Sequence, residues 1–158
     1  PPRNRRRPPR NRGRRPGTLP TPNRSPATTG VLIYPSPVTF PQSDLRALDT
    51  AEEIDIETQA PDGAVHRTTV WPILNRGQIF VRSLHGTEGR WYREAMANPA
   101  VAIYVDGRRI LATAVPADDP DSIDRCSAGF RLKYGDDPSL DSMLVPEILA
   151  ATLRLVPV

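Results

Sequence analysis

The sequence predicts an α+β domain built as a small six-stranded antiparallel barrel with peripheral helices. Strand-like segments follow one another through short turns, without the long crossovers that a parallel sheet needs. The spacing of apolar residues then changes to a helical period over residues 90–97 before strand patterning resumes. Asp106-Gly107 between two apolar runs is the strongest short hairpin signal in the chain. These three observations favour an antiparallel sheet.

The first half of the domain, from about Phe40, predicts one short helix and three strands. Residues 41–48 carry Ser43 and Asp44 near their start, which is typical of a helix N-terminus. Residues 53–58 alternate between apolar and polar side chains and predict a half-buried strand. Turn signals at 61–63 and 75–77 delimit two further strands, at 66–74 and 78–82. Three strands joined by two short turns predict a meander.

The second half predicts more helix. A helix over 90–97 ends at Asn98-Pro99. Strands at 101–105 and 109–115 then form the hairpin, and a helix at 123–134 ends at Gly135. A second helical piece over 140–149 is broken by Pro146, and residues 152–156 predict the last strand.

The charge of the chain divides into two parts. The 158 residues carry a net charge of +3, with 21 basic and 18 acidic groups. Residues 1–30 contribute +9 through nine arginines and also hold eight of the 19 prolines, whereas residues 31–158 contribute −6. We therefore divide the chain into a disordered Arg/Pro-rich arm, residues 1–37, and a folded domain, residues 38–158.

Two interpretations of the arm stay open. It binds nucleic acid or anionic lipid through its arginines, or it is a solvated tail or a stretch upstream of the true start, at Val31 or Val38. The acidic domain excludes a uniformly basic nucleic-acid surface, so the arm is the one place where nucleic acid is expected.

Few residues suit a disulfide or a metal. Cys126 is the single cysteine, so an intramolecular disulfide is excluded and a cytoplasmic location is expected. His66 and His85 are the only histidines and do not form a metal-binding motif, so no metal site is predicted. No run of apolar residues reaches the length of a membrane span.

The segment 82–92 carries the clearest sign of function. A predicted strand ends, a loop with Gly86 and Gly89 follows, and a helix begins. A helix N-terminus favours an anion, and Arg82 and Arg90 flank the loop. The loop could therefore hold a phosphate. In the alternative, Thr87 only caps the helix and the arginines are surface charges.

The order of these motifs resembles the split β-barrel flavin/deazaflavin oxidoreductase superfamily. The resemblance is carried by Arg67-Thr68-Thr69 on a strand, Trp91-Tyr92 at a helix start, Asn98-Pro99-Ala100-Val101, and the hairpin that follows. It covers about residues 40–158 and includes deazaflavin-dependent nitroreductase-like and pyridoxamine-phosphate-oxidase-like proteins. Within that fold, a bacterial group of unknown function is the most similar.

The resemblance implies FMN or a deazaflavin in a groove of a homodimer, with a small molecule as substrate. It places the phosphate at the loop before the Trp-Tyr helix and the ring against the Arg-Thr-Thr strand. The cofactor-binding residues carried over by position are Arg67, Thr68, Thr69, Trp71, Arg82, Ser83, His85, Gly86, Thr87, Arg90 and Trp91. The catalytic residues are not assigned. The lysine common in such loops is missing, because Lys133 is the only lysine.

Two functions remain open. The chain is a flavin- or deazaflavin-binding reductase that transfers hydride or electrons to an unidentified small molecule, or it is a non-enzymatic binding or dimerisation module. His66 and Cys126 are expected to be structural, and His85 is either an exposed loop residue or a ligand to the cofactor. The acidic run Asp118 to Asp124 is expected to favour a helix start rather than a metal.

Overall fold

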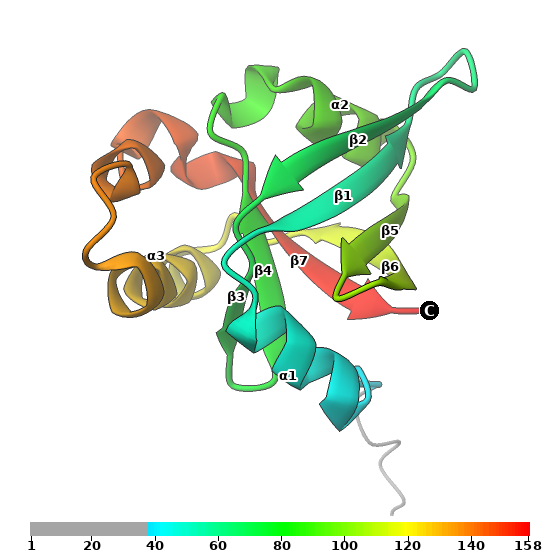
Figure 1. The fold of residues 1–158 in the computed structure, drawn as a ribbon. Helices are drawn as coiled ribbons and strands as arrows, with labels where there is room; N and C mark the ends of the chain where they lie inside the picture. Colours follow the sequence, from blue (N-terminus) through cyan, green and yellow to red (C-terminus); the bar gives the residue numbers. More distant parts are fainter. Residues whose placement is uncertain (1–37) are drawn as a thin grey trace, which may run out of the picture. The chain divides into compact units, whose positions relative to one another are not determined.

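The computed structural model describes residues 38–158, and the predicted arm therefore lies outside the described residues. Seven strands form one antiparallel sheet in the order β2-β1-β5-β6-β7-β4-β3, which curls into a barrel (Figure 1). The strands are β1 (Ile54–Gln59), β2 (Val65–Val70), β3 (Ile73–Asn75), β4 (Gln78–Arg82), β5 (Ala100–Val105), β6 (Arg108–Pro116) and β7 (Thr152–Pro157). The helices are α1 (Gln42–Thr50), α2 (Arg90–Ala97) and α3 (Pro120–Tyr134), with 3-10 turns η1 (Gly86–Glu88), η2 (Leu140–Met143) and η3 (Pro146–Ala151). The α+β antiparallel class is confirmed.

The predicted strand over residues 66–74 is two strands, and the predicted meander was wrong. Pro72 has no N–H to donate to a neighbouring strand, and the pairing is interrupted at Trp71-Pro72. Before this break β2 pairs only with β1, and after it β3 pairs only with β4. β2 and β3 lie at opposite ends of the strand order, so the chain crosses from one edge of the sheet to the other at this break. The sheet therefore has seven strands rather than the six predicted.

The hairpin and the helix before it agree with the prediction. Asp106 and Gly107 both have positive φ, at 50° and 71°, as a two-residue turn of this kind requires. Helix α2 spans residues 90–97 as expected. Helix α3 begins three residues earlier than expected, because the Asp119 carboxylate accepts the N–H of Ser122 and caps it. The predicted helix over 140–149 is two 3-10 turns separated around Pro146.

Two apolar cores lie on the two faces of β4. Ile79 and Val81 point into the barrel with residues such as Ile56. Phe80 points the other way, into a second core beneath α3 that includes Phe130. Successive side chains of a strand alternate between faces, so a strand covered on both sides buries almost every residue, and in β4 only Gln78 is half-buried rather than buried. Arg82 follows Phe80 by two residues and therefore also enters the second core.

Cys126 is fully buried in this second core, as predicted for a packing residue. Within residues 38–158, no helix combines the length and apolar character needed to cross a membrane.

Candidate ligand-binding cavity

A cavity of about 370 Å³ opens between the end of β2, the loop after β4, the start of α2 and the η2 turn. Its walls combine apolar, aromatic and hydroxyl-bearing side chains. Six of the eleven predicted cofactor-binding residues line it, namely Thr68, Thr69, Trp71, Arg82, His85 and Trp91. The other lining residues are Val70, Leu84, Ser139, Ser142 and Met143. Segments far apart in the sequence therefore meet around one hollow.

Both tryptophans of the chain line this cavity. Trp71 stacks on Tyr134, with ring centroids 4.1 Å apart and planes 11° apart. The Tyr134 hydroxyl donates to the carbonyl of Glu52 at 2.7 Å, and burial raises the pKa of this phenol above its usual range. Trp91 is largely buried and meets Tyr92 edge-on. Trp71 is therefore held by a fixed aromatic partner, as a wall of a preformed site should be.

The loop between β4 and α2 is compact. Gly86 has a φ of 65°, which favours glycine, and its amide donates to the carbonyl of Ser83. Ser83 is fully buried, and its Oγ has no hydrogen-bond partner within residues 38–158. Neither residue lines the cavity. Thr87 is exposed beside them.

Helix α2 starts without a side-chain cap. Its N-cap residue is Gly89, so the alternative in which Thr87 caps the helix was wrong. Arg93 is the first residue whose amide bonds back, to the carbonyl of Gly89. The three preceding helical amides are therefore available to an acceptor outside the helix.

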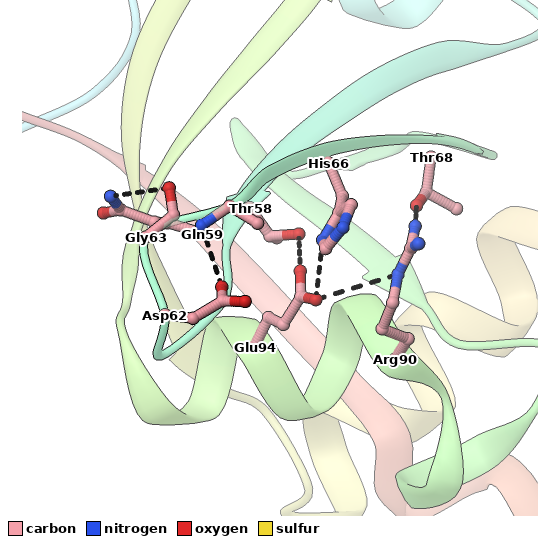
Figure 2. A network of polar contacts seen from close by, with 9 residues as sticks. Thr58, Gln59, Asp62, Gly63, His66, Thr68, Arg90 and Glu94 are labelled. Atoms are coloured by element: carbon pink, nitrogen blue, oxygen red, sulfur yellow. Dashed lines mark hydrogen bonds and ion pairs between the residues drawn. The ribbon is translucent and has the colours of Figure 1, made fainter.

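Arg90 lies beside the cavity-lining residue Thr68, within a polar network that Figure 2 shows. Its Nη2 donates to Thr68 Oγ1 at 3.3 Å, and its Nε lies 3.7 Å from Oε1 of Glu94. The Glu94 carboxylate is buried, accepts from Thr58 Oγ1 at 2.7 Å, and lies 2.8 Å from His66 Nδ1. Half of the Arg90 side chain remains exposed, so its guanidinium is positioned by the network but still open to a ligand.

Arg82 occupies an interior position. Only 1% of the residue is exposed. Its guanidinium donates to Thr152 Oγ1 at 2.8 Å, to Ser127 Oγ at 3.1 Å, and to the carbonyls of Met143 and Ile123 at 2.9 and 3.2 Å. Arg82 thus joins four segments from inside and does not flank the loop at the surface.

Arg67 is not brought to the cavity. It lies on the opposite face of β2, with its guanidinium 3.3 Å from the centre of the Tyr104 ring and its Nε 3.9 Å from Glu57. Thr69 donates to Asp55 at 2.9 Å on β1, although it also borders the cavity. The three arginines expected in one region therefore lie apart: Arg67 on the outer face of β2, Arg82 in the interior, and Arg90 on α2 beside Thr68.

The residues that sequence reasoning missed come mainly from η2. Ser139, Ser142 and Met143 lie at least 50 positions beyond the loop, and the sequence around them indicates only a helical piece over 140–149. Glu94 was missed because an acid on a short helix is expected to face water. The available signal was the alternation of side chains along β1 and β2, which places Thr58 and His66 on the side of α2, where they contact Glu94.

Comparison with known proteins now adds the family. A family described as an uncharacterized protein conserved in bacteria (DUF2255) matches residues 44–155, and the chain belongs to it. No curated protein matches the chain.

Solved structures share the fold at low identity. The conserved hypothetical protein Rv2991 of Mycobacterium tuberculosis is 16% identical with a TM-score of 0.59, covering 77% of this chain and 83% of that one. A putative pyridoxamine 5′-phosphate oxidase of Listeria innocua is 17% identical with a TM-score of 0.56, covering 73% and 91%. An F420-H2 dependent reductase (FDR-A) is 14% identical with a TM-score of 0.51, covering 66% and 93%. These structures share the split β-barrel fold of this chain.

Proposed function

We propose that this protein is a reductase-like protein that binds FMN or a deazaflavin, with the cofactor ring in the cavity. The observation that carries the proposal is the convergence of Trp71, Trp91, Thr68 and His85 on one hollow at the start of α2. The resemblance in sequence assigned these same residues to a cofactor.

The dimensions and chemistry of the cavity fit part of such a cofactor. A volume of about 370 Å³ lies near the lower end of the roughly 300–1,000 Å³ typical of ligand sites, enough for a ring system. The phosphate-bearing chain would extend outward over the loop. There Arg90 and Thr87 are exposed, and the amides at the start of α2 are free to donate.

When bound, such a cofactor would supply hydride or electron transfer, and the protein would bind and orient it. Trp71 would offer a flat wall that Tyr134 holds in place. Thr68, fixed by Arg90, would present a hydroxyl at the mouth. His85 is exposed and borders the cavity, so it is placed to donate a hydrogen bond to the ligand.

The decisive experiment uses the two tryptophans as reporters. Because both line the cavity, titration with FMN and with F420 should quench most of the intrinsic fluorescence at saturation. Trp71→Phe and Trp91→Phe should each keep part of the quenching. The proposal is overturned if neither cofactor changes the fluorescence at near-millimolar concentration.

A matched pair of arginine variants tests the phosphate position. Arg90→Ala should weaken cofactor binding about ten-fold, because a bond to a charged group is lost. Arg93→Ala removes the same charge from the same helix, but among the described residues Arg93 makes no side-chain bond to a residue that lines the cavity, whereas Arg90 donates to Thr68, so the affinity should change little. Equal effects of the two variants would show that only general charge matters.

A second candidate function is a binding module without redox activity. It is favoured by the commitment of two cations to the protein itself: Arg82 bonds four interior oxygens, and Lys133 donates to the carbonyls of Leu48 and Pro72. This leaves Arg90 to meet a phosphate at the loop, which is a sparse anion site. If FMN and F420 both fail in the titration, this function replaces the first.

The homodimer is also a proposal. It is supported by the resemblance to split-barrel proteins, and sedimentation of the purified chain over a range of concentrations tests it. A monomer at all concentrations would contradict it.

A further inference from the structure

The buried guanidinium of Arg82 lacks a negative partner. Within residues 38–158, no carboxylate oxygen lies within 4 Å of it to form an ion pair. Its four hydrogen-bond acceptors are two hydroxyls and two backbone carbonyls, all of them neutral. A fully buried charge is usually paired, because an unpaired one loses its hydration without compensation.

Cys126 does not supply the missing charge. Its thiol lies in the same core, but burial raises its pKa to about 12, so it is neutral at pH 7. Burial also lowers the pKa of Arg82 from its usual value, and the nearby Arg131 acts in the same direction. The interior around Arg82 is therefore electropositive.

One donor of Arg82 is left over. A guanidinium has five N–H groups. The Nε, the two Nη1 and one of the Nη2 hydrogens account for the four bonds, so one Nη2–H has no partner in the described part of the chain. Arg82 is also among the residues that line the cavity, next to Met143, whose carbonyl it holds. The cavity is thus the route by which an acceptor can reach this donor.

We propose that the cavity binds a small aromatic acid, with its carboxylate directed toward Arg82. The walls suit such a ligand. Trp71 and Trp91 offer aromatic contact for a flat apolar body, and the hydroxyl of Ser139 can donate to an acidic group. The carboxylate would be the counter-ion that the fold itself omits. This inference does not rest on the proposed function, because the charge argument needs no cofactor, and the acid and the cofactor ring are alternative occupants of the same aromatic walls.

The first test compares benzoate with benzamide, which have nearly the same shape and differ in charge. The full chain without added cofactor is titrated with each, followed by tryptophan fluorescence and by thermal unfolding. Benzoate should bind at least about ten-fold more tightly, as expected for bonds to a charged group, and should raise the midpoint of unfolding. Equal binding of the two compounds, or no binding of either, overturns the proposal.

A second test supplies the counter-ion from the protein. Ser142 is exposed, lines the cavity and precedes Met143, so a substitution there should leave the fold intact. Ser142→Asp places a carboxylate in the wall and should abolish the preference for benzoate over benzamide. Ser142→Asn has nearly the same volume without the charge and should keep the preference. If both variants behave alike, Arg82 does not select the charge of the ligand.

Arg82→Gln should also remove the preference if the variant folds; a preference that survives in it overturns the proposal. The outcomes remain separable from those of the cofactor titration. Benzoate selectivity without FMN or F420 binding removes the cofactor and keeps the acid site. Binding of FMN or F420 without a preference for benzoate removes the acid site and keeps the cofactor.

Discussion

The turn into α2 brings Gly89 against the buried hydroxyl of Ser83, and this contact can be tested by a double-mutant cycle. A Cβ added at Gly89 would lie far inside contact distance of Ser83 Oγ, and 3.3 Å from the carbonyl oxygen of Gly86. The backbone of Gly89, with φ −59° and ψ 135°, suits any residue. The cost of Gly89→Ala therefore comes from the collision and not from the dihedral angles.

The expected magnitudes follow from this geometry. Overpacking costs roughly 1–3 kcal/mol, and alanine in place of glycine at a compatible backbone returns roughly 0.4–1 kcal/mol, so Gly89→Ala should destabilise the fold by about 1–2 kcal/mol. Ser83→Ala removes a buried hydroxyl that has no partner within residues 38–158, so it should be neutral or stabilising by up to about 1 kcal/mol. In that background Gly89→Ala should cost about 0–0.5 kcal/mol, because only the Gly86 contact remains.

Urea unfolding of the four proteins measures this coupling. The slopes of the transitions should agree, so that shifts in midpoint convert directly into stability. We expect a coupling free energy of about 0.5–2 kcal/mol between the two positions. Additive effects, within about 0.5 kcal/mol, would refute the collision and with it the packing of the loop against the start of α2.

Three further predictions concern buried or paired groups. Thr58→Val should cost about 1.5–3 kcal/mol in urea unfolding, since the buried Glu94 carboxylate loses a donor, and Thr50→Val, at an exposed site, should cost far less. Tyr104→Phe should lower the free energy of unfolding by about 1 kcal/mol near neutral pH, because the Tyr104 hydroxyl bonds to Glu57. This hydroxyl, and then Arg109, lower the pKa of Glu57 in the folded protein. Their stabilisation is therefore present above the unfolded pKa of Glu57 and is lost as the pH falls, so the stabilities of the variant and the wild type should converge in acid. Cys126 should resist iodoacetamide at pH 8 in the native protein and react after unfolding, because its pKa of about 12 and its burial both protect it; rapid native labelling would contradict this.

Local patterns in the sequence were enough to predict α2 and the β5–β6 hairpin. Both are set by residues close in sequence: Asn98-Pro99 ends the helix, and Asp106-Gly107 adopts the positive φ angles of a tight turn. The break at Pro72 has a local cause as well, but its consequence is not local. Whether the two halves of the strand stay neighbours depends on how the whole sheet closes, which no short pattern contains.

The cavity was predictable only on one side. The resemblance pointed to Thr68, Trp71, His85 and Trp91, which come from segments joined by short loops. The opposite wall comes from η2, which reaches the site through the packing of the long α3 helix. Its serines carry no motif, and their contribution depends on tertiary contacts alone.

The positions of Arg82 and Arg90 show how packing determines whether water and salt reach a charged side chain. Arg82 and Arg90 have the same side chain and flank the same loop, yet burial makes one an interior cation and leaves the other half exposed. Salt screens a charge that water reaches far more than one that water does not reach. An anion held by Arg90 alone would therefore be released as ionic strength rises, whereas one that reaches Arg82 would be retained. A ligand that spans both arginines would therefore have a salt-sensitive end at Arg90 and a salt-resistant end at Arg82, and would be fixed in one orientation.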